Sequence, residues 1–196
     1  RTLICALSAS IGAVLVGEVP FRELILNTCP NGIQLSVYKA LIASEAPLRI
    51  ATCSDEPHSL HDFVISRLEF YGHTPVRFGS FVDGRDADWS LVAEEAAMAV
   101  SSGECDEGLF FCWSGTGISI AANKVLGVRA ALVGDAVTAQ EARVWNHANV
   151  LCMSNRALTE GQFIEVLEAW FQNYDKVRGA EGVDLLNGVD KRNRVK

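Results

Sequence analysis

The chain has 196 residues, of which 49% are hydrophobic and 21% are charged, and this composition excludes an intrinsically disordered protein. Its net charge of −7 argues against a nucleic-acid or anionic-membrane partner, because both would repel it, although a local basic pocket still permits a small phosphorylated ligand. None of the six cysteines forms a Cys-x-x-Cys pair, and the four histidines complete no zinc-binding spacing. We therefore expect no metal, no disulfide framework and a reduced, cytoplasmic compartment.

Residues 1–47 form an N-terminal extension to which the sequence assigns no role. Its most apolar run covers residues 3–16, and these 14 residues fall short of the ~20 needed to cross a bilayer. We interpret the run as a buried strand or helix, or as a non-native upstream extension. The apolar part of a signal peptide is the alternative.

From residue 48 onward, short apolar runs alternate with amphipathic stretches, which is typical of a parallel α/β sheet. Strands are predicted at residues 48–53, 74–78, 108–112, 128–133 and 149–153. Helices are predicted at 57–71, 89–101, 118–124 and 138–146, with a last one after Thr159, which forms a capping-box spacing with Gln162. Residues 81–88 are expected to be a polar loop. The pattern predicts a Rossmann-like three-layer α/β/α sandwich over 48–178 with a five-stranded parallel sheet, followed by a polar tail over 179–196.

Ligands of such sheets bind at the carboxyl ends of the strands. The residues predicted at those ends are Asp55, residues 112–117, Asp135 and residues 154–156.

The segment over residues 112–124 combines a strand end, a glycine-rich turn and a helix start. Backbone N–H groups in such a turn point into one concavity and bind anions. Cys112 is expected to have a lowered pKa beside the positive end of a helix, and Ser114 and Thr116 add hydroxyl groups. These groups suit removal of a proton from carbon and stabilisation of the resulting oxyanion.

Two other interpretations of this segment are a nicotinamide-binding turn and a buried structural cysteine. Gly115 and Gly117 form only a fragment of a dinucleotide-binding pattern, which makes a nicotinamide site a weak alternative. A single cysteine at a strand end is more often a small buried hydrophobic residue than a catalyst. The residues alone therefore predict a small-molecule anion site with a candidate thiol base and do not name the substrate.

Residues 114–132 (SGTGISIAANKVLGVRAAL), followed by residues 146–158 (NHANVLCMSNRAL), resemble the ribose-5-phosphate isomerase type B family, which includes the galactose-6-phosphate isomerase subunits. The resemblance extends over about residues 48–178. It implies a cytoplasmic, metal-independent enzyme without a cofactor, a place in pentose phosphate metabolism, and a homodimer or homotetramer whose active site lies between two subunits.

The resemblance also implies roles for individual residues. Cys112 matches the thiol that moves a proton between carbons 1 and 2 of the open-chain sugar. Ser114 matches a threonine that assists ring opening, and Asp55 matches an aspartate near the ring hydroxyls. The turn that holds the enediolate oxygens is formed by Gly115, Thr116, Gly117 and Ile118.

The resemblance assigns further residues to the substrate and its phosphate. Asn146 matches an asparagine that contacts the substrate, and Arg178 matches an arginine that binds the phosphate, usually that of the neighbouring subunit. Trp145 stands where the family has its ring-opening histidine, and His147 follows two residues later. His147 is either a replacement imidazole, if its loop turns inward, or a surface residue.

The chain departs from the family pattern at several other positions. Glu56 replaces the histidine after Asp55, Gly182 replaces a second phosphate arginine, and Trp113 replaces a glycine inside the turn. Trp89, Trp113 and Trp145 are expected around one pocket. They either fill core space or line a pocket reshaped for another substrate.

The remaining histidines and the basic C-terminal residues lie outside the family motif. His58 can reach the pocket entrance, whereas His61 is expected at the surface and His73 in a solvated turn. The basic residues of 191–196 are either a solvated tail or contacts to a partner's phosphate.

The sequence therefore predicts an aldose–ketose isomerase of a small sugar phosphate, with ribose 5-phosphate as first choice. The alternatives are the same chemistry on a tetrose, deoxy- or hexose phosphate, and a non-catalytic sugar-phosphate-binding homologue.

Overall fold

The computed structural model of the protein describes residues 46–194, so the expected extension over 1–47 lies almost entirely outside the described residues. The elements follow one another in the order β1 (Arg49–Ser54), α4 (His61–Phe70), β2 (Thr74–Gly79), α5 (Ser80–Asp83), α6 (Trp89–Ser101), β3 (Glu107–Cys112), α7 (Thr116–Ala122), β4 (Ala130–Leu132), α8 (Ala136–Asn146), β5 (Val150–Ser154), α9 (Glu160–Phe171) and α10 (Ala180–Arg194).

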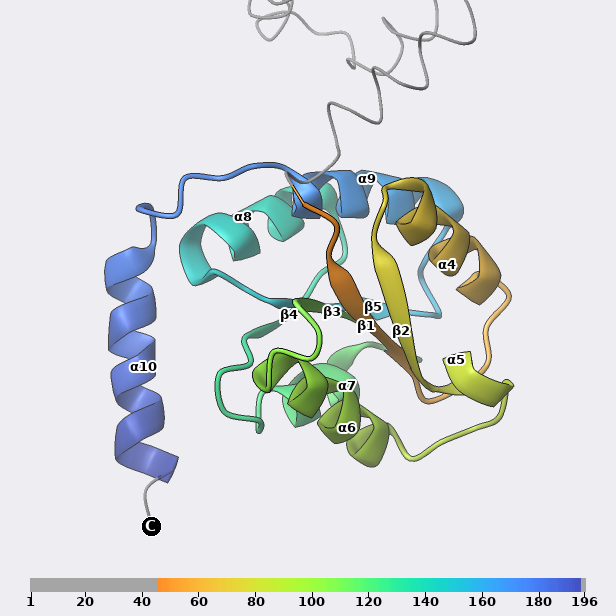
Figure 1. The fold of residues 1–196 in the computed structure, drawn as a ribbon, viewed down its shortest axis with the longest axis horizontal. Coiled ribbons are helices and arrows are strands. Elements are labelled where there is room, and N and C mark those ends of the chain that lie inside the picture. Colours follow the sequence, from red (N-terminus) through yellow and green to blue (C-terminus); the bar gives the residue numbers. More distant parts are fainter. Residues whose placement is uncertain (1–45, 195–196) are drawn as a thin grey trace, which may run out of the picture. The chain divides into compact units, whose positions relative to one another are not determined.

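The five described strands form one all-parallel sheet in the order β2-β1-β3-β5-β4 (Figure 1). The predicted Rossmann-like three-layer fold is thereby confirmed. All six residues of β3 are buried, as its uninterrupted apolar sequence predicts for a central strand covered on both faces.

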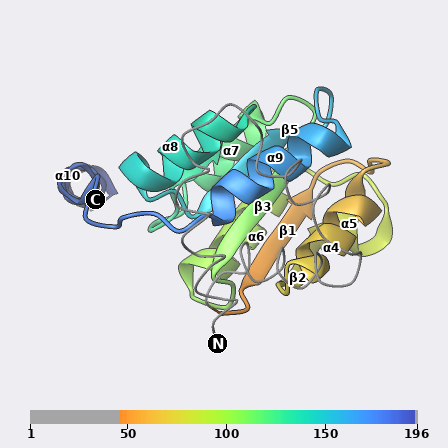
Figure 2. The ribbon, with the colours of Figure 1, turned by 90° about the horizontal axis from the view of Figure 1, so that it is seen from above.

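Helices cover both faces of the sheet. α6 and α7 pack on one face, where their alanines allow close approach to Ala51 and Phe110. α4, α8 and α9 cover the other face, and α9 lies between α8 and α4 along this layer (Figure 2). The fully buried Trp170 and Phe163 of α9 anchor this second layer, at ~1.5–3 kcal/mol for each large apolar side chain removed from water.

Side-chain caps fix the starts of three helices. Asp88 caps α6, Asp135 caps α8, and Thr159 forms with Gln162 the capping box predicted for α9. Asp135 follows β4 at the carboxyl edge as predicted, but its carboxylate is bonded to Thr138 and serves the helix start.

Several local predictions are wrong. His61 and His73 are buried: the His61 ring stacks on Phe81 with 4.0 Å between centroids, and His73 Nδ1 accepts the N–H of Leu48 at 3.3 Å. The loop predicted over 81–88 begins with the short helix α5. Residues 180–194 form α10, which packs against α8.

No helix within residues 46–194 is long and apolar enough to cross a membrane. The same residues contain no group of three or more side chains able to hold a metal ion. The cysteines of the described part are free, buried thiols, namely Cys53, Cys105, Cys112 and Cys152.

Candidate active site

The register of the parallel sheet places three predicted site segments side by side at its carboxyl edge. Ser54 of β1 pairs with Phe111, and Cys112 at the end of β3 pairs with Ser154 of β5. The residues that follow β1 and β5, Asp55 and Asn155, therefore flank Cys112. The sequence predicts that these segments share one edge, but the order of the strands, which makes Asp55 and Asn155 neighbours of Cys112, comes from the structure.

Cys112 and Asp55 are in direct contact. The Cys112 thiol donates to Asp55 Oδ2 at 3.4 Å. The other carboxylate oxygen, Asp55 Oδ1, is buried and has no hydrogen-bond partner among the described residues. An unsatisfied buried acceptor costs free energy unless a ligand completes it, so Asp55 is available to a substrate hydroxyl.

The expected lowering of the Cys112 pKa is wrong. Burial raises the pKa of the Cys112 thiol, and the negative charge and hydrogen bond of Asp55 raise it further. The backbone N–H groups of Ser114 and Gly115 act in the opposite direction with a smaller effect. Burial also raises the pKa of Asp55. The two groups therefore compete for one proton, and the thiol holds it at rest.

The turn after Cys112 requires its glycine. Gly115 has φ +75°, and a Cβ there would lie 2.6 Å from Leu132 Cδ1 and 3.0 Å from the backbone of Met153. Next to it, the hydroxyls of Ser114 and Thr116 are 2.7 Å apart. The N–H groups at the start of α7 thus open at the same edge as the Cys112 thiol.

Trp113 and Trp89 are surface residues of this edge. Trp113 is 58% exposed, its backbone oxygen accepts the Ser154 hydroxyl at 2.8 Å, and its φ is not positive, so replacing a glycine causes no backbone strain there. A Cβ on Gly117 would meet the Trp89 ring at 3.1 Å. The interpretation that these tryptophans fill core space is wrong, and Trp145, at 49% exposure, is likewise outside the core.

Two residues at this edge were not predicted as site residues. Asn155 is only 2% exposed; its backbone N–H donates to Cys112 O at 2.9 Å, and its side-chain amide donates to Glu56 Oε1 at 3.3 Å. Glu56 follows Asp55 directly. The strand ends marked the region over 154–156, but no sequence signal pairs Asn155 with a residue 99 positions away.

The remaining predicted residues lie at the opposite, amino edge. Asn146 ends α8 and His147 follows it with φ +46°, so both precede β5. β5 has five residues. At about 3.3 Å per residue, it separates them from the Cys112 edge by roughly 16 Å. Within one copy of the chain, His147 and Asn146 therefore do not reach the Cys112 thiol.

Trp145 and Arg178 join this second group. The Arg178 guanidinium lies over the Trp145 ring, 4.7 Å from its centroid, and His147 Nε2 donates to Arg178 O at 2.8 Å. Gly179 fits beneath them because a Cβ would lie 2.6 Å from the backbone oxygens of Val144 and Trp145. The segment before α10 is thus docked on the C-terminal end of α8.

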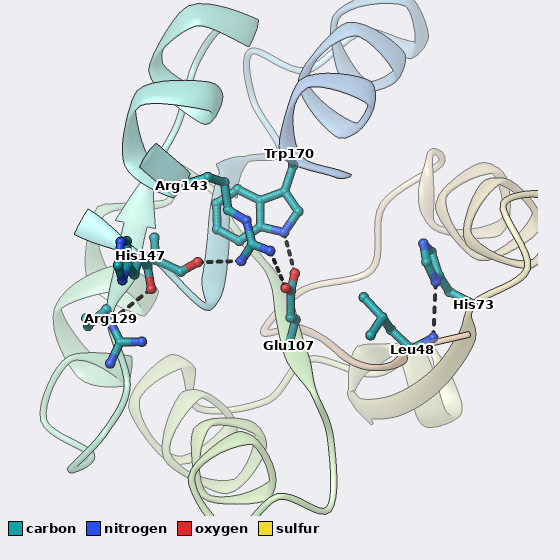
Figure 3. Close-up of polar contacts among 8 residues, drawn as sticks. Leu48, His73, Glu107, Arg129, Arg143, His147 and Trp170 are labelled. Atoms are coloured by element: carbon teal, nitrogen blue, oxygen red, sulfur yellow. Dashed lines mark hydrogen bonds and ion pairs between the residues drawn. The ribbon is translucent and has the colours of Figure 1, made fainter. Parts of the chain in front are cut away.

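A buried ion pair supports the amino edge (Figure 3). Arg143 Nη2 lies 2.5 Å from Glu107 Oε1, and Trp170 Nε1 donates to Glu107 Oε2 at 2.6 Å. Burial raises the pKa of Glu107, whereas the Arg143 guanidinium opposes this effect. Arg143 also donates to Ala148 O at 2.7 Å, which ties the end of α8 to β3 and α9.

Comparisons with known proteins agree with this architecture. A family model described as Ribose/Galactose Isomerase matches residues 50–186. Over 143 residues the chain is 29% identical to ribose-5-P isomerase B of Listeria innocua, covering 72% of this chain and 96% of that relative. Over 67 residues it is 45% identical to D-erythrulose-4-phosphate isomerase 2 of Mycolicibacterium smegmatis, covering 34% of this chain and 44% of that relative.

The solved structures give the same result. The type B ribose 5-phosphate isomerase of Trypanosoma cruzi superposes with a TM-score of 0.70 at 29% sequence identity, covering 75% of this chain and 99% of that one. The resemblance noted in the sequence is thereby confirmed. With its fold and most of its length matched, the chain belongs to the Ribose/Galactose Isomerase family and is an isomerase.

Proposed function

We propose that the protein interconverts an aldose phosphate and a ketose phosphate, with ribose 5-phosphate and ribulose 5-phosphate as the first pair, through a cis-enediolate. The observation that carries the proposal is the contact of the Cys112 thiol with Asp55 Oδ2 beside the glycine turn. A base next to oriented N–H donors is what removal of a proton beside a carbonyl requires.

In this mechanism Asp55 accepts the thiol proton. The thiolate then stands beside a neutral carboxyl group, which avoids two adjacent anions in a site where burial raises the pKa of both groups. The Cys112 thiolate takes the proton from C2, the N–H groups of the turn stabilise the oxyanion at O1, and the thiol returns the proton to C1.

The phosphate is bound between two copies of the chain in this proposal. At the carboxyl edge Arg156 supplies a positive charge, while Asp55 and Glu56 are negative. Arg178 and Asn146 lie at the far edge of the same copy, so they serve this site only from a second copy. A homodimer or homotetramer built from such pairs combines the two groups.

A tetrose 4-phosphate is the second candidate substrate. With O4 esterified, a tetrose cannot close a five-membered ring, so its isomerisation needs no ring-opening group. The position that the family resemblance assigns to ring opening holds Trp145, and Arg178 covers its indole. The relative from Mycolicibacterium smegmatis named D-erythrulose-4-phosphate isomerase 2 supports the same candidate.

Ketose formation from ribose 5-phosphate and consumption of D-erythrulose 4-phosphate, measured side by side, test the proposal. Cys112→Ala is expected to bind phosphate normally and to lose turnover by at least roughly 10³-fold. Cys105→Ala is the matched control, because Cys105 is buried near the opposite edge. Full activity of Cys112→Ala would overturn the thiol mechanism, and a wild type inactive on both sugars would overturn the substrate class.

A further inference from the structure

An aldose–ketose isomerisation moves two protons, and the site described so far accounts for one of them. The proton on C2 moves to C1, and the proton on O2 must move to O1. Backbone N–H groups stabilise the charge on these oxygens but do not transfer a proton between them. A further inference, which rests on the proposed function, concerns the group that carries this second proton.

Other polar groups of the edge already make contacts within the protein. In the proposed mechanism Asp55 holds the proton of Cys112 while the enediolate exists, so its Oδ1 can bind a substrate hydroxyl but the carboxyl group does not take a second proton. The hydroxyls of Ser114 and Thr116 are bonded to each other. His61 is buried against Phe81 and Phe111, where burial lowers its pKa to about 4. His58 Nδ1 accepts the N–H of Leu60 at 3.3 Å, and His58 lines a cavity together with Arg77.

Glu56 is a carboxylate held rigidly at the same edge. Its backbone oxygen accepts the hydroxyls of Ser54 and Ser80, both at 2.8 Å, which pins the turn from β1 and from α5. Its side-chain Oε1 accepts the amide of Asn155 at 3.3 Å. One oxygen is therefore fixed by the protein, while Oε2 makes no hydrogen bond to the described residues and is not buried.

Asn155 links this carboxylate to the backbone of Cys112. The Asn155 backbone N–H donates to Cys112 O at 2.9 Å while its side chain holds Glu56, so one buried residue contacts both Glu56 and the end of β3. The Asn155 amide also donates to Ser54 Oγ at 3.3 Å, which fixes the orientation of the side chain. A buried amide oriented in this way is a rigid support for an active-site carboxylate.

We propose that Glu56 transfers the hydroxyl proton between O2 and O1 of the enediolate, and that Asn155 positions it. When Cys112 has taken the C2 proton, the electron pair forms the C1–C2 double bond and O1 becomes an oxyanion. Glu56 takes the proton from O2 and delivers it to O1. The C2 carbonyl forms as Cys112 protonates C1, so all atoms and charges balance and Glu56 returns to its starting state.

The test follows transfer of the carbon proton separately from overall isomerisation. It uses ribose 5-phosphate in D₂O, or D-erythrulose 4-phosphate if the wild type turns over only that sugar. NMR follows product formation and deuterium exchange at the carbon that loses its proton. In Glu56→Gln we expect product formation to fall by roughly 10²-fold, while carbon exchange falls by less than ~10-fold, because Cys112 still forms the enediolate. The ratio of exchange to isomerisation therefore rises at least ~10-fold.

Two further variants sharpen the result. Asn155→Ala is expected to raise the same ratio to a lesser extent, because Glu56 remains but is no longer held. Asp83→Asn is the matched control, since it removes an exposed carboxylate at the end of α5 and changes the net charge equally. It is expected to keep the wild-type ratio.

The outcomes separate this inference from the proposed function. Equal losses of exchange and isomerisation in Glu56→Gln, or no loss, would overturn the role of Glu56 while wild-type activity upholds the isomerase. Loss of both processes in Cys112→Ala is expected in either case. A wild type that neither exchanges nor isomerises either sugar phosphate would overturn both.

Discussion

The two edges of the sheet differ in chemistry and in construction. At the carboxyl edge the Cys112 thiol lies beside the carboxylates of Asp55 and Glu56. Asp55 Oδ1 and Asn155 Oδ1 are buried there and have no hydrogen-bond partner within residues 46–194. At the amino edge Arg129, Arg143 and Arg178 are bonded or stacked around the end of α8. The carboxyl edge offers proton-transfer groups. The amino edge offers arginines that are held in place by hydrogen bonds and ring contacts.

In the proposed function, this difference means that neither edge alone binds the whole sugar phosphate. A phosphate dianion is repelled by Asp55 and Glu56 and attracted by an exposed arginine such as Arg178. Within one copy of the chain, the length of a whole strand separates Asp55 and Glu56 from Arg178. The comparison therefore favours an assembly in which the carboxyl edge of one copy faces the amino edge of another.

The largest expected effect comes from mixing variants of the two edges. Cys112→Ala should lose at least roughly 10³-fold in turnover, and Arg178→Ala at least roughly 10²-fold. Reassociation of the two mutant chains in equal amounts should restore about a quarter of the wild-type activity, because half the dimers are mixed and each mixed dimer has one intact site. The measurement is turnover after dissociation and reassociation.

A same-edge pair provides the control for this mixing experiment. Cys112→Ala combined with Glu56→Gln alters the same edge of each copy, so no mixed dimer contains an intact site. Recovery with this pair, or no recovery with Arg178→Ala although mixed dimers form, would contradict the shared site.

The second-largest expected effect comes from removing the ion pair that supports the amino edge. Glu107→Ala leaves the buried Arg143 guanidinium without its partner and Trp170 Nε1 without its acceptor, so we expect a loss of about 3–5 kcal/mol in the free energy of unfolding. Urea denaturation measures it. Glu104→Ala is the control, because its 4.0 Å contact with Arg49 is exposed and should change stability by less than ~0.5 kcal/mol.

The third effect concerns the proton shared at the carboxyl edge. Asp55→Asn should lower turnover by roughly 10²-fold, because the thiol loses its proton acceptor. The charge and hydrogen bond of Asp55 raise the pKa of Cys112, so their removal should shift alkylation of Cys112 to lower pH. Mass spectrometry of iodoacetamide-treated protein follows the labelled residue. An unchanged or upward-shifted alkylation profile would contradict the coupling.

Much of the fold could be predicted because local patterns determine it. The apolar run over 108–112 has only one low-energy environment, the centre of a covered sheet, and Thr159 with Gln162 marks a helix start through bonds confined to one turn. The rule that parallel strands end at one edge placed Cys112 and Asp55 at the same edge, and the structure shows that they are in contact.

The rest of the site depends on register and burial, which a single sequence does not specify. The bond of Asn155 to Glu56 joins residues 99 positions apart and exists only because β1 and β5 flank β3. The sign of the Cys112 pKa shift was mispredicted because burial and Asp55 outweigh the N–H groups of the turn. His61 and His73 were predicted outside the core because histidine is a polar residue type, although His61 lies at helical spacing from the buried Val64 and Leu68 of α4.

The smallest expected effect is a pH-dependent loss of stability that is caused by His61, which is buried beneath the carboxyl edge. Burial lowers the pKa of His61 from 6.5 to about 4, so the folded state holds it neutral while the unfolded chain binds a proton below pH 6.5. The stabilisation is therefore complete above pH 6.5 and is lost as the pH falls towards 4. By pH 4.5 we expect a loss on the order of 1–2 kcal/mol after solvent screening.

Urea denaturation at pH 7 and pH 4.5 measures this effect. His61→Phe keeps an aromatic ring against Phe81 and should lose less stability between the two pH values than the wild type. Burial also lowers the pKa of His73, which packs on Phe171 at the other edge, so His73→Phe should flatten the pH dependence in the same direction. Because the two residues lie at opposite edges, their effects should add in the double variant. An unchanged pH dependence in His61→Phe would show that the ring is protonated as readily in the folded chain as in the unfolded one.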